Sequence, residues 1–182
     1  MNKINSTFLF LFVVAIGLLS CNKQVSLEEQ IVAMGKRQKA LPSLKSPAYR
    51  NVTDSLYHLI DSFVELNVDH PKSPAYLMKL AEYKNSKDDV LGGAETFKLL
   101  QKRYPEDELA PAALLRAALI YQSSINDLVH SKKLFNRLIK EYPDSEEAKN
   151  AKANLEFLNS GLTAEEYLNK KISERIKESN SP

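Results

Sequence analysis

The 182-residue chain contains one cysteine, no tryptophan, five glycines and three histidines. A single cysteine excludes an internal disulfide and a metal site built from several thiolates. His58, His70 and His130 lie far apart, and none has a further ligand residue at a recognised metal-binding spacing, so we expect no bound metal. The sequence also lacks a glycine-rich phosphate loop and the motifs G-x-S-x-G and H-E-x-x-H. We therefore expect no catalytic residues, no cofactor and no enzymatic activity.

The formal net charge is only +2. A dedicated nucleic-acid-binding protein would carry a clustered basic excess, so we expect no nucleic acid as a partner. Residues 22–50 contain six basic side chains against two acidic ones. This segment could lie close to anionic lipid head groups, or it could be a solvated spacer with one short helix; both interpretations stay open. Pro42 and Pro47 are expected to break the chain after that helix.

The first 20 residues have the features of a secretory signal peptide. Lys3 supplies a positive charge, and an apolar run of twelve residues follows it, from Phe8 to Leu19. This run is too short to span a hydrocarbon core as a helix, which takes roughly 20 residues. The next residues, Leu18-Leu19-Ser20-Cys21, resemble the bacterial lipobox. That resemblance implies that Cys21 carries the lipid and becomes the mature N-terminus; the alternative is an ordinary signal peptide or uncleaved anchor with a chance cysteine.

The residue after Cys21 is Asn22, and no acidic residue occurs among the next few positions. By resemblance to other bacterial lipoproteins, the absence of aspartate at this position permits sorting to the outer membrane. The absence of an acidic cluster favours the periplasmic side. We therefore expect a lipid-anchored protein of the cell envelope, on the outer membrane and facing the periplasm.

One residue pattern, Y-x13-F-x2-L-x4-P, occurs three times, beginning at Tyr49, Tyr83 and Tyr121. A period of about 34 residues with helical patterning on both sides of a turn predicts helical hairpins. Proline disfavours the α conformation of the residue before it. We therefore expect the three helices that contain the phenylalanines to end at His70-Pro71, Tyr104-Pro105 and Tyr142-Pro143, with His70 as a packing residue.

Helix starts are also marked in the sequence. Ser26-x-x-Glu29 and Thr163-x-x-Glu166 match the capping-box pattern. Ser73-Pro74 predicts a helix with a serine N-cap and proline in the first turn. Residues 110–121 are apolar nearly all round, which predicts a helix flanked on both sides.

Together these segments resemble tetratricopeptide repeats of the subtype A-x-x-x-F-x-x-L-x-x-x-YP. The small residue twelve positions before the proline is Gly93 in one copy and Ser131 in another. The resemblance implies an all-α, right-handed solenoid over residues 49–182, preceded by a signal peptide (1–20) and a basic linker with a short helix (21–48). Its parts are expected to be a half repeat (49–71), repeats (72–105 and 106–143), a helix (144–160) and a capping helix (163–178). The stripe Leu168, Ile172 and Ile176 of the capping helix is expected to face the stack, with its basic residues outward: Lys170, Lys171, Arg175 and Lys177.

Similar repeat domains occur in the lipoprotein subunit of the outer-membrane β-barrel assembly machine and in the Tol-Pal accessory protein. This similarity implies an interaction or scaffolding module for a protein or peptide partner in the envelope. By the same resemblance, the concave face is lined by exposed side chains of the first helix of each pair, with these candidates for partner binding: Met78, Glu82, Arg116, Lys149 and Lys152. The alternative is a structural protein whose repeats serve oligomerisation without a separate ligand.

Overall fold

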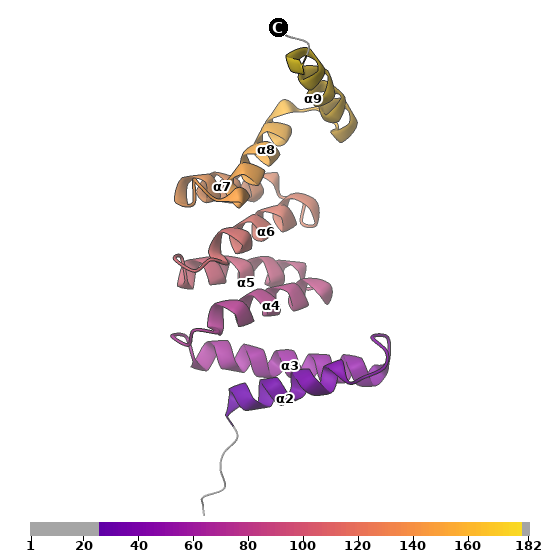
Figure 1. The fold of residues 1–182 in the computed structure, drawn as a ribbon, viewed down its shortest axis with the longest axis vertical. Coiled ribbons are helices and arrows are strands. Elements are labelled where there is room, and N and C mark those ends of the chain that lie inside the picture. Colours follow the sequence, from indigo (N-terminus) through magenta and orange to yellow (C-terminus); the bar gives the residue numbers. More distant parts are fainter. Residues whose placement is uncertain (1–25, 180–182) are drawn as a thin grey trace, which may run out of the picture. The chain divides into compact units, whose positions relative to one another are not determined.

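The computed structural model describes residues 26–179, so the predicted signal peptide and Cys21 lie outside the described residues. In this range the chain is helical and has no strand (Figure 1). Its helices are α2 (Leu27–Lys39), α3 (Pro47–Leu66), α4 (Ser73–Ser86), α5 (Val90–Arg103), α6 (Ala110–Ser123), α7 (Leu128–Glu141), α8 (Glu146–Ser160) and α9 (Ala164–Ser179). The all-α prediction is confirmed. The chain divides into two compact units, residues 1–59 and 60–182, and each is described by itself. The right-handed winding stays a prediction.

The first unit contains α2 and the beginning of α3. The predicted capping box is present: Ser26 Oγ accepts from the Glu29 amide, and a Glu29 carboxylate oxygen accepts from the Ser26 amide. The side-chain amide of Gln38 donates to the Thr53 hydroxyl at 2.6 Å and links α2 to α3. Pro47 is the first residue of α3, where a missing N–H costs no helical hydrogen bond. It therefore opens a helix, and the expectation that it breaks the chain is wrong.

In the second unit the helices pack in chain order, α4 with α5, α5 with α6, α6 with α7 and α7 with α8. Helix α6 also contacts α8, as its all-round apolar sequence predicts. The interior contains side chains from both helices of each hairpin that have little or no exposed surface: Leu77, Phe97, Leu100, Leu114, Phe135 and Leu138. Leu66, the leucine of the first copy of the repeat pattern, is instead 75% exposed.

The small residues of the repeat pattern allow close helix packing. A Cβ atom added to Gly93 would lie 3.0 Å from the Ala81 carbonyl oxygen and 3.0 Å from the Asn85 Cβ, closer than most Cβ contacts, so a larger residue here would force α5 or its neighbours on α4 to shift. Ser131 occupies the matching place on α7 and is fully buried. The pattern thus identified two positions where helix contact limits side-chain size.

Two of the three predicted helix ends are confirmed. Helices α5 and α7 end one residue before Tyr104 and Tyr142, which are their C-caps. Helix α3 instead ends at Leu66, several residues before His70-Pro71. The Asn67 side-chain amide donates to the Phe63 carbonyl at 3.0 Å and so occupies a carbonyl at the end of the helix. His70 packs against Phe63 with ring centroids 5.0 Å apart, as expected for a packing residue.

The turns inside the two hairpins share one conformation. Asp88 and Asn126 both have positive φ, at 63° and 58°. Each is followed by an aspartate N-cap: Asp89 accepts from the Gly92 amide, and Asp127 accepts from the His130 amide. Aspartate and asparagine tolerate the left-handed conformation better than most residues. The dipeptides Asp-Asp and Asn-Asp are therefore equivalent parts of the repeat.

Ser73 is not the N-cap of α4. It is the first helical residue, after Lys72, and its hydroxyl is fully buried and donates to the Asn67 carbonyl at 2.5 Å. The prediction of a serine cap is wrong because this hydroxyl is needed by the turn between α3 and α4.

The C-terminal helix is capped as predicted but presents a different face to the stack. Gly161 ends α8 at φ 67°, and Thr163 and Glu166 form the capping box. Helix α9 contacts α8 through Tyr167, which packs on Phe157, and through Lys171, which pairs with Glu156 at 2.5 Å. The stripe Leu168, Ile172 and Ile176 is exposed. The expectation that this stripe faces the stack, with Lys171 outward, is therefore wrong.

Candidate functional site

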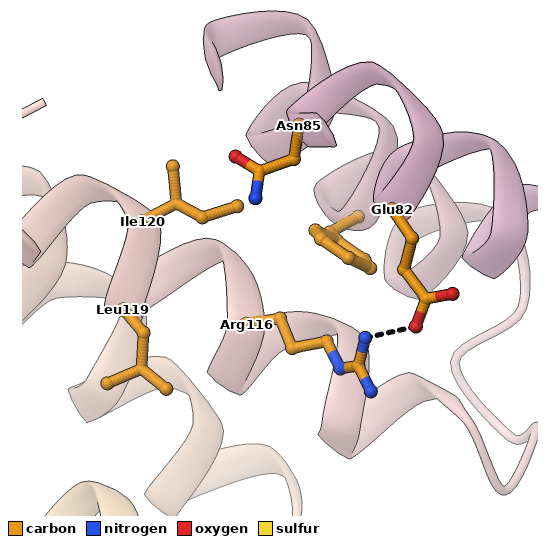
Figure 2. A pocket seen from close by; sticks show the side chains of 6 residues that line it. Glu82, Asn85, Arg116, Leu119 and Ile120 are labelled. Atoms are coloured by element: carbon orange, nitrogen blue, oxygen red, sulfur yellow. Dashed lines mark hydrogen bonds and ion pairs between the residues drawn. The ribbon is translucent and has the colours of Figure 1, made fainter. Parts of the chain in front are cut away.

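A groove of about 290 Å³ lies between α4 and α6, which are the first helices of the α4–α5 and α6–α7 hairpins (Figure 2). We call it the α4–α6 groove, and six residues of α4, α5 and α6 line it: Glu82, Asn85, Phe97, Arg116, Leu119 and Ile120. Their positions follow from the packing described above. The Gly93 contact brings α5 against α4, and α6 packs on the other side of α5. The ring of Phe97 is almost fully buried where the three helices meet.

Arg116 and Glu82 form the charged part of the groove. The Arg116 guanidinium pairs with the Glu82 carboxylate, as Figure 2 shows. It also lies over the Phe97 ring, with the guanidinium carbon 5.7 Å from the ring centroid. Both charged side chains are about half exposed, so the pair itself contributes at most about 1 kcal/mol to stability. The pair instead holds the arginine in a defined position against an aromatic face.

The remaining lining residues offer apolar surface and one amide. Leu119 is 37% exposed and projects from α6, whereas most of Ile120 is buried. Asn85 contributes a side-chain amide from α4 (Figure 2). An apolar side chain placed against Leu119 would displace water, and an amide can hydrogen-bond a peptide backbone. The groove therefore combines apolar contact with polar groups that can fix the direction of a bound chain.

The structure brings together two of the five candidate residues, Glu82 and Arg116, as one ion pair. Met78 lies on the same helix as Glu82 but is only 9% exposed, so the expectation of an exposed methionine is wrong. Lys149 and Lys152 are exposed on α8, as expected, and neither lines the groove. Lys149 pairs with Glu146 at 2.5 Å on its own helix.

Sequence reasoning missed four lining residues: Asn85, Phe97, Leu119 and Ile120. Phe97 belongs to the repeat pattern, and most of its side chain is buried. The sequence carried one signal for Leu119: residues 110–121 are apolar nearly all round, but this pattern does not show which apolar side chain stays exposed.

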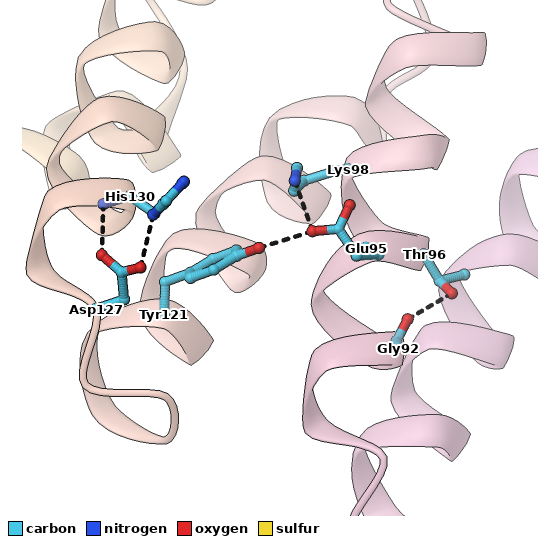
Figure 3. A network of polar contacts seen from close by, with 7 residues as sticks. All are labelled: Gly92, Glu95, Thr96, Lys98, Tyr121, Asp127 and His130. Carbon is cyan, nitrogen blue, oxygen red and sulfur yellow. Dashed lines mark hydrogen bonds and ion pairs between the residues drawn. The ribbon is translucent and has the colours of Figure 1, made fainter.

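A second polar cluster lies where α5, α6 and α7 meet (Figure 3). The Glu95 carboxylate accepts from the Tyr121 hydroxyl at 2.7 Å and from the Lys98 ammonium at 2.6 Å. The Tyr121 ring stacks on His130 at a centroid distance of 5.4 Å. The His130 ring nitrogen Nδ1 lies 2.6 Å from the Asp127 carboxylate. These contacts join consecutive helices. The cluster is therefore explained by its structural role of linking α5, α6 and α7.

The same contacts shift the pKa values of two groups, the Glu95 carboxyl and the Tyr121 phenol. Burial raises the pKa of the Glu95 carboxyl, but the hydrogen bonds from Lys98 and Tyr121 outweigh it and lower that pKa below its ordinary value. The pKa of the Tyr121 phenol is raised, first by burial and then by its hydrogen bond to Glu95. Glu95 is therefore held as a carboxylate and Tyr121 as a neutral hydrogen-bond donor.

Among residues 26–179, no group of three or more potential ligand side chains is arranged to hold a metal ion. None of the helices described in that range combines the length and hydropathy needed to cross a membrane.

The fold is a series of helical hairpins in which tyrosine, phenylalanine and proline recur at fixed positions of the repeat. This arrangement defines the class of protein as the tetratricopeptide-repeat type. The profile of the YfiO family, described as outer membrane lipoprotein, matches residues 48–175, which is more than half of the chain. The chain belongs to this family of outer membrane lipoproteins. The predicted class of protein and its predicted place at the outer membrane are thus confirmed. No curated protein matches the chain.

Proposed function

We propose that this outer membrane lipoprotein is a non-enzymatic interaction module, anchored through Cys21 and facing the periplasm. Its α4–α6 groove would bind an extended segment of a protein or peptide partner. The observation that carries the proposal is the position of Leu119, an exposed aliphatic side chain beside an arginine held against Phe97. The volume of the groove, about 290 Å³, lies at the lower limit of small-molecule pockets and suits one or two side chains of a peptide.

The charged pair supports the proposal in a specific way. Arg116 and Glu82 already satisfy each other, so the groove carries both signs of charge and no large excess of either. A partner segment with an apolar side chain next to a carboxylate would contact Leu119 and share the Arg116 guanidinium. Arginine and aromatic residues are enriched among the residues that contribute most to protein interfaces.

The test uses the full-length lipoprotein in intact cells. A photo-crosslinking amino acid at position 119 is expected to give a discrete adduct with another envelope protein. The same group at position 150, where Asn150 is exposed on α8, is the control and should not give that adduct. The absence of any adduct at position 119, or the same adduct at both positions, would contradict the proposal.

A matched pair of variants then tests the arginine. Arg137 pairs with Glu141 on α7 at 2.8 Å and is exposed to nearly the same extent as Arg116. We expect Arg116→Ala to reduce the adduct at position 119 and Arg137→Ala to leave it unchanged. The alternative, repeats that oligomerise through the groove, predicts instead an adduct of twice the mass that contains only this protein.

A further inference from the structure

Helix α9 has an exposed apolar stripe that makes none of its contacts with α8 described above. Leu168, Ile172 and Ile176 recur at i, i+4 and i+8 and are 59%, 48% and 55% exposed. Tyr167 and Lys171, on an adjoining face of the helix, make the contacts with α8. Leu168, Ile172 and Ile176 are four residues apart and therefore share one face of α9, and the contacts of Tyr167 and Lys171 with α8 leave that face exposed.

An uncovered stripe at the end of a helical stack is unusual. Terminal helices of repeat proteins normally present a polar outer face, because no further repeat covers them. Contiguous exposed apolar side chains usually mark an interaction surface. The stripe therefore has the features of an interaction surface.

The charges of α9 indicate which occupant fits. Residues 164–179 contain four acidic and four basic side chains, so two copies of this helix carry no net charge that would repel. Glu165, Leu168, Ile172 and Arg175 follow one another at spacings of three, four and three, which is the pattern of a coiled-coil seam. Glu165 and Arg175 are both exposed, and neither is engaged in an ion pair within the described residues.

We propose that α9 is a self-association surface on which two copies of the chain pair antiparallel. With Leu168 of one copy facing Ile172 of the other, Glu165 of each copy faces Arg175 of its partner, at both ends of the contact. A parallel pair would instead place Glu165 against Glu165 and Arg175 against Arg175. The charge pattern thus selects the antiparallel arrangement, and the two-fold symmetric contact closes at a dimer.

This proposal goes beyond the function proposed for the groove. The α9 surface shares no residue with the α4–α6 groove, so a dimer formed through α9 would carry two such grooves. A single helix pair buries less than the roughly 1,200 Å² of most stable interfaces, so the dimer is expected to be reversible. Anchoring both copies in one membrane raises their effective concentration and favours pairing.

The test is sedimentation equilibrium of the full-length lipoprotein in density-matched detergent over a range of protein concentrations. The wild-type protein is expected to show a monomer–dimer equilibrium. Ile172→Lys should raise the dissociation constant by at least about tenfold, because a charged side chain replaces a central apolar one. Lys170→Glu, a charge reversal on the opposite face, is the control and should leave the constant unchanged.

Charge reversal distinguishes this pairing from other uses of the stripe. Glu165→Arg and Arg175→Glu should each raise the dissociation constant about three- to tenfold, because two symmetric ion pairs become like-charge pairs. The double variant, Glu165→Arg with Arg175→Glu, should recover the wild-type constant. Far-ultraviolet circular dichroism of each variant checks that the helix content is kept.

Three results would overturn the proposal: a wild-type monomer at every concentration, an unchanged dimer in Ile172→Lys, or no recovery in the double charge reversal. Arg116→Ala should leave the dimer unchanged. If Arg116→Ala abolished it, the repeats would associate through the groove and the α9 proposal would be wrong. If no partner adduct forms at position 119, the α9 dimer is still expected, so the two proposals can fail separately.

Discussion

The hydroxyl of Tyr142 donates a hydrogen bond of 2.9 Å to the carbonyl oxygen of Pro105, the proline that follows α5. Tyr104 makes an equivalent contact one repeat earlier, where its hydroxyl donates to the Val68 carbonyl at 2.5 Å. The tyrosine before each of these two repeat prolines thus ties its own turn to the turn of the preceding repeat. The YP dipeptide therefore ends a helix and also links consecutive turns.

We expect Tyr142→Phe to lower the free energy of unfolding by about 1–3 kcal/mol. The change removes the hydrogen bond to Pro105 and the one that the Tyr142 hydroxyl accepts from the buried Gln101 amide at 3.1 Å. Thermal unfolding followed by circular dichroism measures the effect. Tyr49→Phe is the control, because the Tyr49 hydroxyl makes no hydrogen bond among the described residues. Equal stability of the two variants would show that the link between turns contributes nothing.

Gly93→Leu is expected to destabilise the protein by about 1–3 kcal/mol, because the new side chain would meet the Ala81 backbone and Asn85 where α5 touches α4. Gly35 on α2 offers the contrasting case, since a Cβ there would meet nothing within 4 Å. Gly35→Ala should therefore stabilise the protein by about 0.5–1 kcal/mol through reduced backbone entropy of the unfolded chain. Chemical denaturation of both variants is the measurement, and a Gly93→Leu protein as stable as wild type would disprove the close contact.

The Glu95 contacts predict how stability depends on pH. The pKa of this carboxyl is lower in the folded protein than its ordinary value of 4.5, so its contribution to stability is present above that pH and is lost as the pH falls. Glu95→Gln should be less stable than wild type near neutral pH, and the difference should shrink toward pH 3. Thermal midpoints of both proteins across that range measure it. A difference that stayed constant with pH would mean that the ionised carboxylate is not what stabilises the contact.

Cys21→Ala is expected to prevent lipid attachment. The protein should then leave the membrane fraction or remain unprocessed at its larger size, because lipid chains contribute about 0.8 kcal/mol per buried CH₂ to membrane binding. Cell fractionation with immunoblotting is the measurement. If the variant kept both the membrane attachment and the size of the wild-type protein, Cys21 would not be the anchor.

Local features of the sequence predicted most of the secondary structure. The capping boxes at Ser26 and Thr163 form as expected, because their partners lie three residues away and no distant contact competes. The proline stops after α5 and α7 are equally local. The repeat phenylalanines are all buried, whereas Leu66, at the leucine position of the first copy, is exposed, so a shared spacing does not by itself give equivalent surroundings.

Other features depend on contacts between segments that no local pattern contains. The Ser73 hydroxyl bonds to the Asn67 carbonyl across a turn, so a residue with an ideal capping side chain does not cap. Met78 is buried by its neighbours, and Glu82 meets Arg116 from another helix. The periodicity of α9 correctly marks an apolar face, but periodicity carries no information about which neighbour covers it. Tyr167 and Lys171 bind α8 instead, and only their three-dimensional contacts reveal that the stripe is left exposed.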